Sequence, residues 1–380
     1  MHNRIAKIRI FKDDSYILVF FMFMSILSRV VMTNKIYFVI VDLVLGLSII
    51  LKFLVFDQLK KYLLLMVIPT ILFYFSYNIA GNDFLAEHII SISFFLPYSL
   101  LIYKGDFSKS FISKVSFIIE CSFLFLILVQ GNKCFFWDMR NPMSAYLLLF
   151  VMPLFIPSRN GEKTVSSKIL IFHSSFILLI GFLLSGRGGI ICFGVFLIGL
   201  LIAYFMESTD FDLSRFLFSF CLVLVLFVLF VYVLNNIDSL QVVFSRFYEK
   251  GGTSDVSNEP RYIMIMQYLE NLNNFSNIFF GVNAKNCSLI YFFNNNPHNS
   301  YINIHMKYGL IALLIVIIAF VREMFYSFKE KKISWLFFVM AVSIRVFTDM
   351  LMGGAILDVF VYYLILKHLD GVKKLTPKAV

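Results

Sequence analysis

Charged side chains are scarce in this sequence. Asp, Glu, Lys and Arg make up only 15% of its 380 residues, whereas 60% are hydrophobic. An average soluble domain is about a quarter charged and about half apolar. One soluble domain of this length cannot enclose so much apolar surface, and a disordered chain requires low hydrophobicity. The composition therefore excludes a soluble globular enzyme and a disordered chain, and it predicts a polytopic membrane protein.

Cysteine and strand-like alternation are also lacking. Five cysteines are too few for a disulfide scaffold. Cys134 and Cys287 fall in segments predicted to be external, where an oxidising compartment would allow them to pair, but their proximity stays open. No alternation of apolar and polar residues competes with the long apolar runs, and only helices or closed barrels cross a bilayer. The expected fold class is an all-α, polytopic integral membrane helical bundle.

Apolar runs long enough to cross about 30 Å of hydrocarbon recur along almost the whole chain. The basic stretch before the first run lacks a small-residue cleavage site after it, which favours a retained first span over a cleaved signal peptide. We expect about twelve transmembrane helices, near residues 15–33, 36–56, 62–80, 88–103, 111–129, 143–157, 168–184, 188–206, 213–234, 300–320, 334–350 and 353–367.

The net charge of +10 is spread over short clusters of Lys and Arg. Nucleic-acid binding needs a basic patch on one folded face, so we expect no nucleic-acid partner. The clusters fall in every second loop, and by the positive-inside rule both termini are predicted to be cytoplasmic. The acidic loop 81–87 then lies outside, whereas 207–215 is assigned to the cytoplasm by alternation alone. The clusters are Lys60 and Lys61; Lys104, Lys109 and Lys114; Arg159, Lys163 and Lys168; and Lys329, Lys331 and Lys332.

One connection is far longer than the others. Residues 235–299 run for 65 residues on the external side, and loops of this length are usually functional. Pro260 suits a first helical position and opens a predicted helix over 261–272. Its apolar residues are expected to lie against the membrane surface or the bundle: Tyr262, Ile263, Met266 and Leu269.

This loop divides the chain into three parts. Residues 1–234 are expected to form an N-terminal transmembrane bundle of about nine spans, and 235–299 the long external loop with short helices. Residues 300–380 are expected to hold the C-terminal transmembrane helices and a cytoplasmic tail. No internal repeat and no second domain is evident.

Charged residues inside predicted spans are costly and often functional. Arg345 and Asp349 are spaced i,i+4, so one helix face can pair them. Two interpretations stay open, namely structural ion pairs and the proton or substrate path of a transporter. The chain lacks a clear pair of Gly/Pro-interrupted spans, the usual sign of a transporter site. The charged residues are Arg29, Asp42, Glu120, Arg345, Asp349 and Asp358.

Three arginines on the external side indicate an anion site. Arg187 lies in the turn 185–189 (Ser-Gly-Arg-Gly-Gly), and the next predicted span begins at Gly188. A helix N-terminus beside a guanidinium suits a phosphate. Arg246 and Arg261 of the long loop add two further guanidiniums. The alternatives are a tight turn whose Arg reaches lipid headgroups, and solvated loop arginines.

The candidate general base is a histidine just before the predicted span 300–320, at its external end. His298 has Asn, Ser and Tyr neighbours at a predicted membrane interface, and imidazole exchanges protons near neutral pH. The alternative is a helix cap or a hydrogen-bonded surface group. His305, about two turns on, is expected to be a buried, satisfied imidazole facing the same cavity. We expect no metal site, since Asp210 and Asp212 suit the first turn of a helix better than a metal.

In this order the motifs resemble those of the O-antigen polymerase and O-antigen ligase family of bacterial envelope glycosyltransferases. A Ser-Gly-Arg-Gly turn at 185–188 is followed by a long external loop with an arginine, Arg261, opening a helix. Then comes Pro-His-Asn-Ser-Tyr at 297–301, running into Lys-Tyr-Gly-Leu-Ile at 307–311. The resemblance covers about residues 180–320, and the first half matches only in its number of spans.

The resemblance implies a metal-independent, inverting glycosyltransferase of the GT-C class in the bacterial inner membrane. It implies that Arg187 and Arg261, and more weakly Arg246, bind the pyrophosphate of an undecaprenyl-pyrophosphate-linked glycan at the periplasmic face. His298 would take the proton of the acceptor hydroxyl, with Asn299 and Tyr301 as substrate-binding residues.

The implied partners are the lipid-linked oligosaccharide donor and acceptor, membrane lipids and a chain-length regulator protein, with no cofactor. We favour a polymerase that joins lipid-linked repeat units. A ligase that transfers the polymer to the lipid A core is the nearest alternative. A flippase or another transporter of lipid-linked glycans fits less well, because it should have short external loops.

Overall fold

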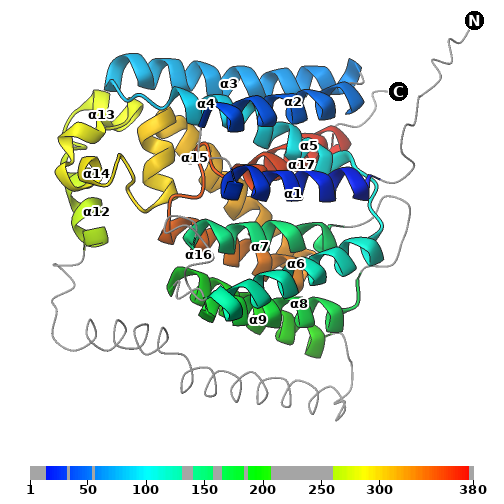
Figure 1. Ribbon diagram of the computed structural model, residues 1–380. Helices are drawn as coiled ribbons and strands as arrows, with labels where there is room; N and C mark the ends of the chain where they lie inside the picture. The colour runs from blue at the N-terminus through cyan, green and yellow to red at the C-terminus, as the bar shows by residue number, and fades with distance from the viewer. Residues whose placement is uncertain are drawn as a thin grey trace, which may run out of the picture.

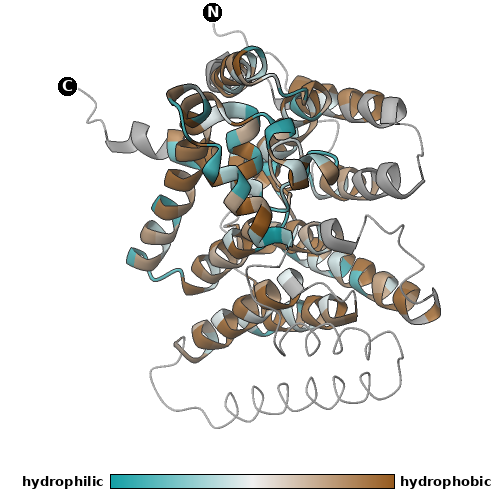
Figure 2. Cartoon of the chain, turned by 90° about the vertical axis from the view of Figure 1, so that its left-hand side faces the viewer, coloured by the Kyte–Doolittle hydropathy of each residue, from teal (hydrophilic) through white to brown (hydrophobic). Residues whose placement is uncertain are grey.

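The computed structural model describes residues 14–31, 35–53, 56–130, 140–156, 165–183, 187–206 and 260–375. All regular structure in these ranges is helical (Figure 1). Helices lie at every predicted span except 213–234, which falls outside the described residues. Five helical stretches in the described ranges are long and apolar enough to cross a membrane, and hydrophobic residues predominate along the helices (Figure 2). The prediction of a helical membrane protein is confirmed at this level, and the count of twelve spans stays a prediction.

The described residues of the first half of the chain lie mostly in helices. The π-helical turn Ser91–Phe95 joins α4 to α5, so that Leu85–Lys104 forms one apolar stretch. Gly46 lets α2 approach this turn, because a side chain there would collide with the carbonyl of Ser93. The helices are α1 (Ser15–Val31), α2 (Lys35–Phe53), α3 (Phe56–Ala80), α4 (Leu85–Ile90), α5 (Leu96–Lys104), α6 (Lys109–Gln130), α7 (Arg140–Phe155), α8 (Ser167–Leu183) and α9 (Arg187–Met206).

Three short helices stand together at one end of the long ones (Figure 1). We call residues 260–292 the cap and this end of the bundle the cap end. The cap consists of α12 (Pro260–Glu270), α13 (Phe275–Phe280), the 3₁₀ turn Ala284–Asn286 and α14 (Ser288–Phe292). Three long helices follow it: α15 (Ser300–Lys329), α16 (Ile333–Thr348) and α17 (Asp358–Leu375).

The predicted helix in the long loop is confirmed as α12, and the face that it packs on the rest of the protein is formed by other residues than the four named above. Met264 and Tyr268, spaced i,i+4, are buried. Tyr262, Met266 and Leu269 are exposed and do not pack on the bundle, so that their contact with the membrane surface stays a prediction. The buried face is decided by Tyr268, because its hydroxyl bonds to a histidine on α15.

α9 and α16 pack closely because glycines face the partner helix. A side chain at Gly188 would collide with Thr348, and one at Gly199 would collide with the ring of Phe337. The first contact joins the start of α9 to the end of α16, and the second joins a later residue of α9 to the beginning of α16, so the two helices run antiparallel. This packing places the N-terminus of α9 beside the C-terminus of α16, at the cap end.

α15 is broken inside the membrane-length stretch at Gly309, whose φ of 76° and ψ of −174° are not helical. A Cβ at this position would collide with the carbonyl of Phe279 in α13. Broken helices are tolerated at membrane depth where other groups satisfy the freed backbone. Asn82 and Ser76 do so by donating to the carbonyl of Met306, at 3.1 and 3.0 Å. The predicted span 300–320 is therefore a longer helix of two segments.

The last helix begins later than predicted. The span was expected from residue 353, but α17 starts at Asp358, and residues 349–357 form a loop. Gly353 and Gly354 have φ values of 79° and 89°, which exclude a right-handed helix. Their N–H groups donate to the Asp358 carboxylate at 2.6 and 2.7 Å. Asp358, which was predicted to be a charge inside a span, thus holds the loop to the start of α17 by its carboxylate.

Candidate functional site

His298 occupies a strained turn between the cap and α15. Its φ is 48°, and Asn294 and Asn295 have φ values of 55° and 61°. For a residue with a side chain this conformation costs about 1–2 kcal/mol. The backbone N–H of His298 donates to Oδ1 of Asn296 at 2.8 Å. The turn therefore holds the imidazole in one place at the expense of local strain.

Asn299 and Tyr301 hold the start of α15 in this structure. Oδ1 of Asn299 accepts hydrogen bonds from the N–H groups of Tyr301 (2.9 Å) and Ile302 (3.1 Å), which makes it the N-cap of the helix. The Tyr301 hydroxyl bonds to Oγ of Ser343 on α16 at 3.0 Å. These two predicted substrate-binding residues thus adjoin His298, and both have intramolecular partners.

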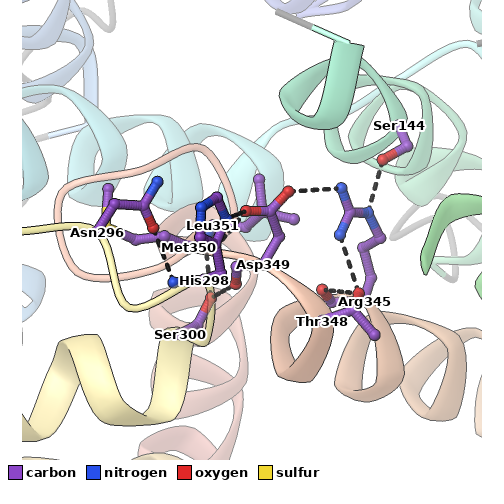
Figure 3. A network of polar contacts seen from close by, with 9 residues as sticks. All are labelled: Ser144, Asn296, His298, Ser300, Arg345, Thr348, Asp349, Met350 and Leu351. Atoms are coloured by element: carbon purple, nitrogen blue, oxygen red, sulfur yellow. Dashed lines mark hydrogen bonds and ion pairs between the residues drawn. The ribbon is translucent and has the colours of Figure 1, made fainter. Parts of the chain in front are cut away.

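Asp349 links His298 to Arg345 (Figure 3). One carboxylate oxygen lies 3.5 Å from Nδ1 of His298, and the other lies 3.3 Å from Nη2 of Arg345. Burial raises the pKa of Asp349, but its close contact with His298 and the charge of Arg345 outweigh this effect, so that its pKa lies below the usual value. The carboxylate is therefore charged at neutral pH. The predicted i,i+4 ion pair is confirmed, whereas its contact with His298 was not predicted.

The contact with Asp349 decides which nitrogen of His298 can act as a base. A carboxylate beside Nδ1 favours the tautomer that carries its proton on Nδ1. The lone pair of Nε2 is then free to accept a proton, and Nε2 has no hydrogen-bond partner among the residues that the structure describes. The side chain is 23% exposed, so an incoming hydroxyl can reach it. A carboxylate, an imidazole and an accessible Nε2 form the general-base part of the Ser-His-Asp arrangement.

Arg345 is buried and joins three helices at the cap end. Its Nε donates to Oγ of Ser144 on α7 at 2.7 Å, and its Nη1 donates to Oγ1 of Thr348 at 3.0 Å. It also faces Gly188 in the first turn of α9. The N-terminus of this 20-residue helix carries a partial positive charge, which adds to that of the guanidinium.

The structure brings part of the predicted anion site to His298. Arg261 lies half-buried in the first turn of α12, and its charge has a weak electrostatic effect on Arg345. Arg187 is the first residue of α9, but its side chain lies outside the described residues, as does the whole of Arg246. The start of α9, Arg261 and His298 are thus drawn together around the Arg345–Asp349 pair.

A polar stripe on α15 holds the loop that carries Asp349. Ser300, Asn303 and Lys307 follow the spacing i, i+3, i+7, which places them on one helix face. Each of them bonds to the backbone of the loop, so the position of Asp349 beside His298 is fixed by α15 itself. The bonds run from Ser300 Oγ to the Asp349 carbonyl (2.6 Å), from Asn303 Nδ2 to the Met352 carbonyl (2.7 Å) and from Lys307 Nζ to the Gly353 carbonyl (2.7 Å).

His305 anchors the cap, and the prediction of a satisfied buried imidazole is confirmed. Its Nε2 bonds to the carbonyl of Ile278 at 2.7 Å, so that ring nitrogen carries the proton. Its Nδ1 then accepts from the Tyr268 hydroxyl at 2.5 Å, and burial raises the pKa of Tyr268, which keeps that proton in place. His305 thus faces the cap, and it positions the helix that carries Arg261.

The remaining candidates are possible metal ligands, the two cysteines predicted to be external and the other charges of the predicted spans. No cluster of His, Cys, Asp or Glu suited to a metal occurs in the part of the chain that the structure describes. Cys287 is a free, buried thiol, whose pKa burial raises to about 11; Cys134 lies outside the described residues. Glu120 is buried against His173, at 2.9 Å. The side chains of Arg29 and Asp42 lie outside the described residues.

Comparison of the chain with protein-family models, curated proteins and solved structures found no match. The arrangement of the site must therefore carry the functional argument. An aligned imidazole base stands beside a buried guanidinium, a helix N-terminus and a second arginine. Such a site can remove a proton from a hydroxyl while it stabilises negative charge on a leaving group.

Proposed function

We propose that the chain is a metal-independent, inverting glycosyltransferase that joins undecaprenyl-pyrophosphate-linked repeat units, as an O-antigen polymerase does. The observation that carries the proposal is the alignment of His298 by Asp349 beside the positive end of α9 and Arg261. The order of the motifs, from the arginine turn to the histidine at a helix start, supports the same family.

In the proposed reaction, Nε2 of His298 takes the proton of the acceptor hydroxyl. The acceptor oxygen attacks the anomeric carbon of the donor from the face opposite the pyrophosphate. A new C–O bond forms, the bond to the pyrophosphate breaks, and the pyrophosphate leaves with the electron pair. Asp349 stabilises the imidazolium that results, and the negative charge of the leaving group is held by Arg261, Arg187 and the N-terminus of α9. The guanidinium groups of arginine supply this stabilisation without a metal.

We further propose that the cap end faces the periplasm and that the chain resides in the bacterial inner membrane with both termini in the cytoplasm. The alternation of Lys and Arg clusters supports this orientation. A substrate that is itself a membrane lipid accounts for the position of the site at the end of a helical bundle.

A ligase would use the same site with a different acceptor, the lipid A core. A transporter is less well supported, because a transport path needs charges that are free to exchange partners. Several buried charges among the described residues of the bundle are instead held in pairs, namely Arg345 with Asp349, Glu120 with His173, and Glu323 with Lys367. Lys307 and Asp358 are buried without an ion-pair partner in the described part of the chain, and they are fixed by hydrogen bonds to Ser91 and to the backbone of Gly353 and Gly354.

The test is a gel of the lipopolysaccharide from cells in which the His298→Ala variant is the only copy of this protein. We expect a core with a single repeat unit, the result for a polymerase without its base. A bare core together with long lipid-linked polymer would indicate a ligase, and a lack of any repeat at the periplasmic face would indicate a flippase. Full-length polysaccharide would show that His298 is not the base. His368→Gln is the matched control, because His368 lies near Ala319 and Glu323 and should leave the pattern unchanged.

A further inference from the structure

We propose that residues 291–296 form the binding surface for the acceptor sugar, with Phe293 as the ring on which a neutral pyranose stacks. This inference rests on the proposed function and adds to it the substrate group and the residues that hold it. The segment has the sequence Tyr-Phe-Phe-Asn-Asn-Asn and leads directly to His298.

Three consecutive aromatic side chains are exposed in this segment. Tyr291 is 54% exposed, Phe292 76% and Phe293 38%. The ring of Phe293 contacts that of His298, with centroids 5.7 Å apart and an angle of 77° between the planes. A partly exposed aromatic side chain therefore lies directly beside the proposed base.

The amides that follow add hydrogen-bonding groups to the same surface. Asn294 is exposed, and Asn296 uses its Oδ1 to hold the backbone of His298. Oδ1 of Asn295 is buried, and no donor bonds to it among the described residues. A buried acceptor without a partner costs about 1–3 kcal/mol. A hydroxyl group of a ligand would satisfy this oxygen.

The combination selects a neutral sugar ring. A pyranose has a face of C–H groups, which packs against an aromatic ring as other apolar groups do, and a rim of hydroxyls, which amides bind. Residues 291–296 carry no charged side chain, whereas the positive groups lie on the side of α9 and α12. The uncharged acceptor ring is therefore placed on Phe293, and the anionic donor group on the arginine side. A ring with one face free of axial hydroxyls fits best.

The position of Phe293 also explains how a hydroxyl reaches the base. Because the planes of Phe293 and His298 are nearly perpendicular, a sugar ring that lies parallel to Phe293 stands nearly perpendicular to the imidazole, and its rim is then the part that can approach Nε2. The hydroxyl at that rim is the one whose proton Nε2 takes. The segment therefore sets which acceptor hydroxyl reacts, and Phe293 is a positioning residue.

Saturation-transfer NMR on the full chain in lipid nanodiscs tests this proposal. The probes are the methyl glycosides of glucose, galactose, mannose and N-acetylglucosamine. We expect saturation to reach the ring C–H protons of at least one of them in the wild type and in Phe293→Trp. In Phe293→Leu we expect roughly tenfold weaker binding, as the loss of an aromatic contact worth about 1.4 kcal/mol implies.

Phe275→Leu is the matched control. Phe275 is likewise an exposed aromatic residue, 70% exposed, but it lies in the cap and stacks on Phe279, so its replacement should not affect sugar binding. Equal signals from all variants, or no signal from the wild type with any of the probes, would overturn the proposal. Brominated lipid that quenches the fluorescence added by Phe293→Trp, after the signal of the two native tryptophans in the wild type is subtracted, would also overturn it, because the segment would then lie in the membrane interface.

Failure of this inference can be distinguished from failure of the proposed function. If Phe293→Leu loses sugar binding while His298→Ala cells still elongate polysaccharide, the sugar surface stands and the proposed base is wrong. If His298→Ala abolishes elongation but Phe293→Leu binds sugar as the wild type does, the enzyme stands and the acceptor surface lies elsewhere.

Discussion

At the scale of single residues, the site depends on side chains that are far apart in the sequence. His298 was recognisable from its neighbours, but Asp349, which orients its ring, lies at the end of another helix. The i,i+4 spacing of Arg345 and Asp349 indicated an ion pair and contained no sign of the histidine. Ser144, which binds the guanidinium from α7, had no sequence signal at all.

The residue-scale prediction concerns Asp349→Asn. The amide keeps the shape of the carboxylate, but it lacks the charge that stabilises the imidazolium and favours the tautomer with Nδ1 protonated. We expect glycosyl transfer to fall by about 10²–10⁴-fold. This is the usual contribution of a general base, and His298 cannot make it without the carboxylate that orients its ring. Transfer of labelled repeat units in purified membranes measures the rate.

Protein level and monodispersity, measured by fluorescence-detected size-exclusion chromatography, control for misfolding of this variant. An Asp349→Asn enzyme with normal folding and full activity would contradict the role given to Asp349.

At the scale of elements, the break in α15 explains the role of Gly309, which the Lys-Tyr-Gly-Leu-Ile motif at 307–311 left open. Gly309 follows Tyr308 in the Tyr-Gly-Leu-Ile stretch, and only glycine fits there because φ is positive and Phe279 leaves no room for a Cβ. The break lets α13 pack into the helix, and with it the cap whose first turn carries Arg261. A packing requirement of the cap thus accounts for this residue of the motif.

The element-scale prediction compares Gly309→Ala with Gly194→Ala. Alanine at 309 must adopt a positive φ and displace the backbone of α13, so we expect destabilisation of about 1–3 kcal/mol. Gly194 lies inside α9, and a methyl group added there would meet no neighbouring atom within 4 Å, so alanine should be neutral or stabilise the protein by up to about 1 kcal/mol. Thermal unfolding in detergent compares the two variants with the wild type. A Gly309→Ala protein as stable as Gly194→Ala would contradict the account of the break.

At the scale of the whole molecule, the outer surface is apolar over long helices. α3 exposes Leu64, Val67 and Ile71 along its length. Leaving such side chains in water costs roughly 25 cal/mol for each Å² of apolar area, whereas hydrocarbon imposes no such penalty. The surface therefore agrees with a chain embedded in a bilayer, with the cap at one end of the bundle.

The prediction at this scale concerns orientation. Asn273 in the cap and Glu330 between α15 and α16 are both exposed. Single cysteines at these positions, in a chain whose five native cysteines are replaced, should react differently with a membrane-impermeant maleimide. We expect Asn273→Cys to be labelled in intact spheroplasts and Glu330→Cys only after permeabilisation. The reverse pattern would place the cap, and the proposed site, in the cytoplasm.

The sequence by itself determined the class of protein, the position of nearly every described long helix, the helix in the long loop, and His298 and Arg261 as candidates. These features depend on local composition and periodicity, which hydropathy and charge record directly. Only the tertiary structure decided the contact of Asp349 with His298, the break at Gly309, the later start of α17 and the buried face of α12. Each of these depends on contacts between segments distant in the chain or on positive φ angles that packing enforces, and neither leaves a periodic signal in the sequence.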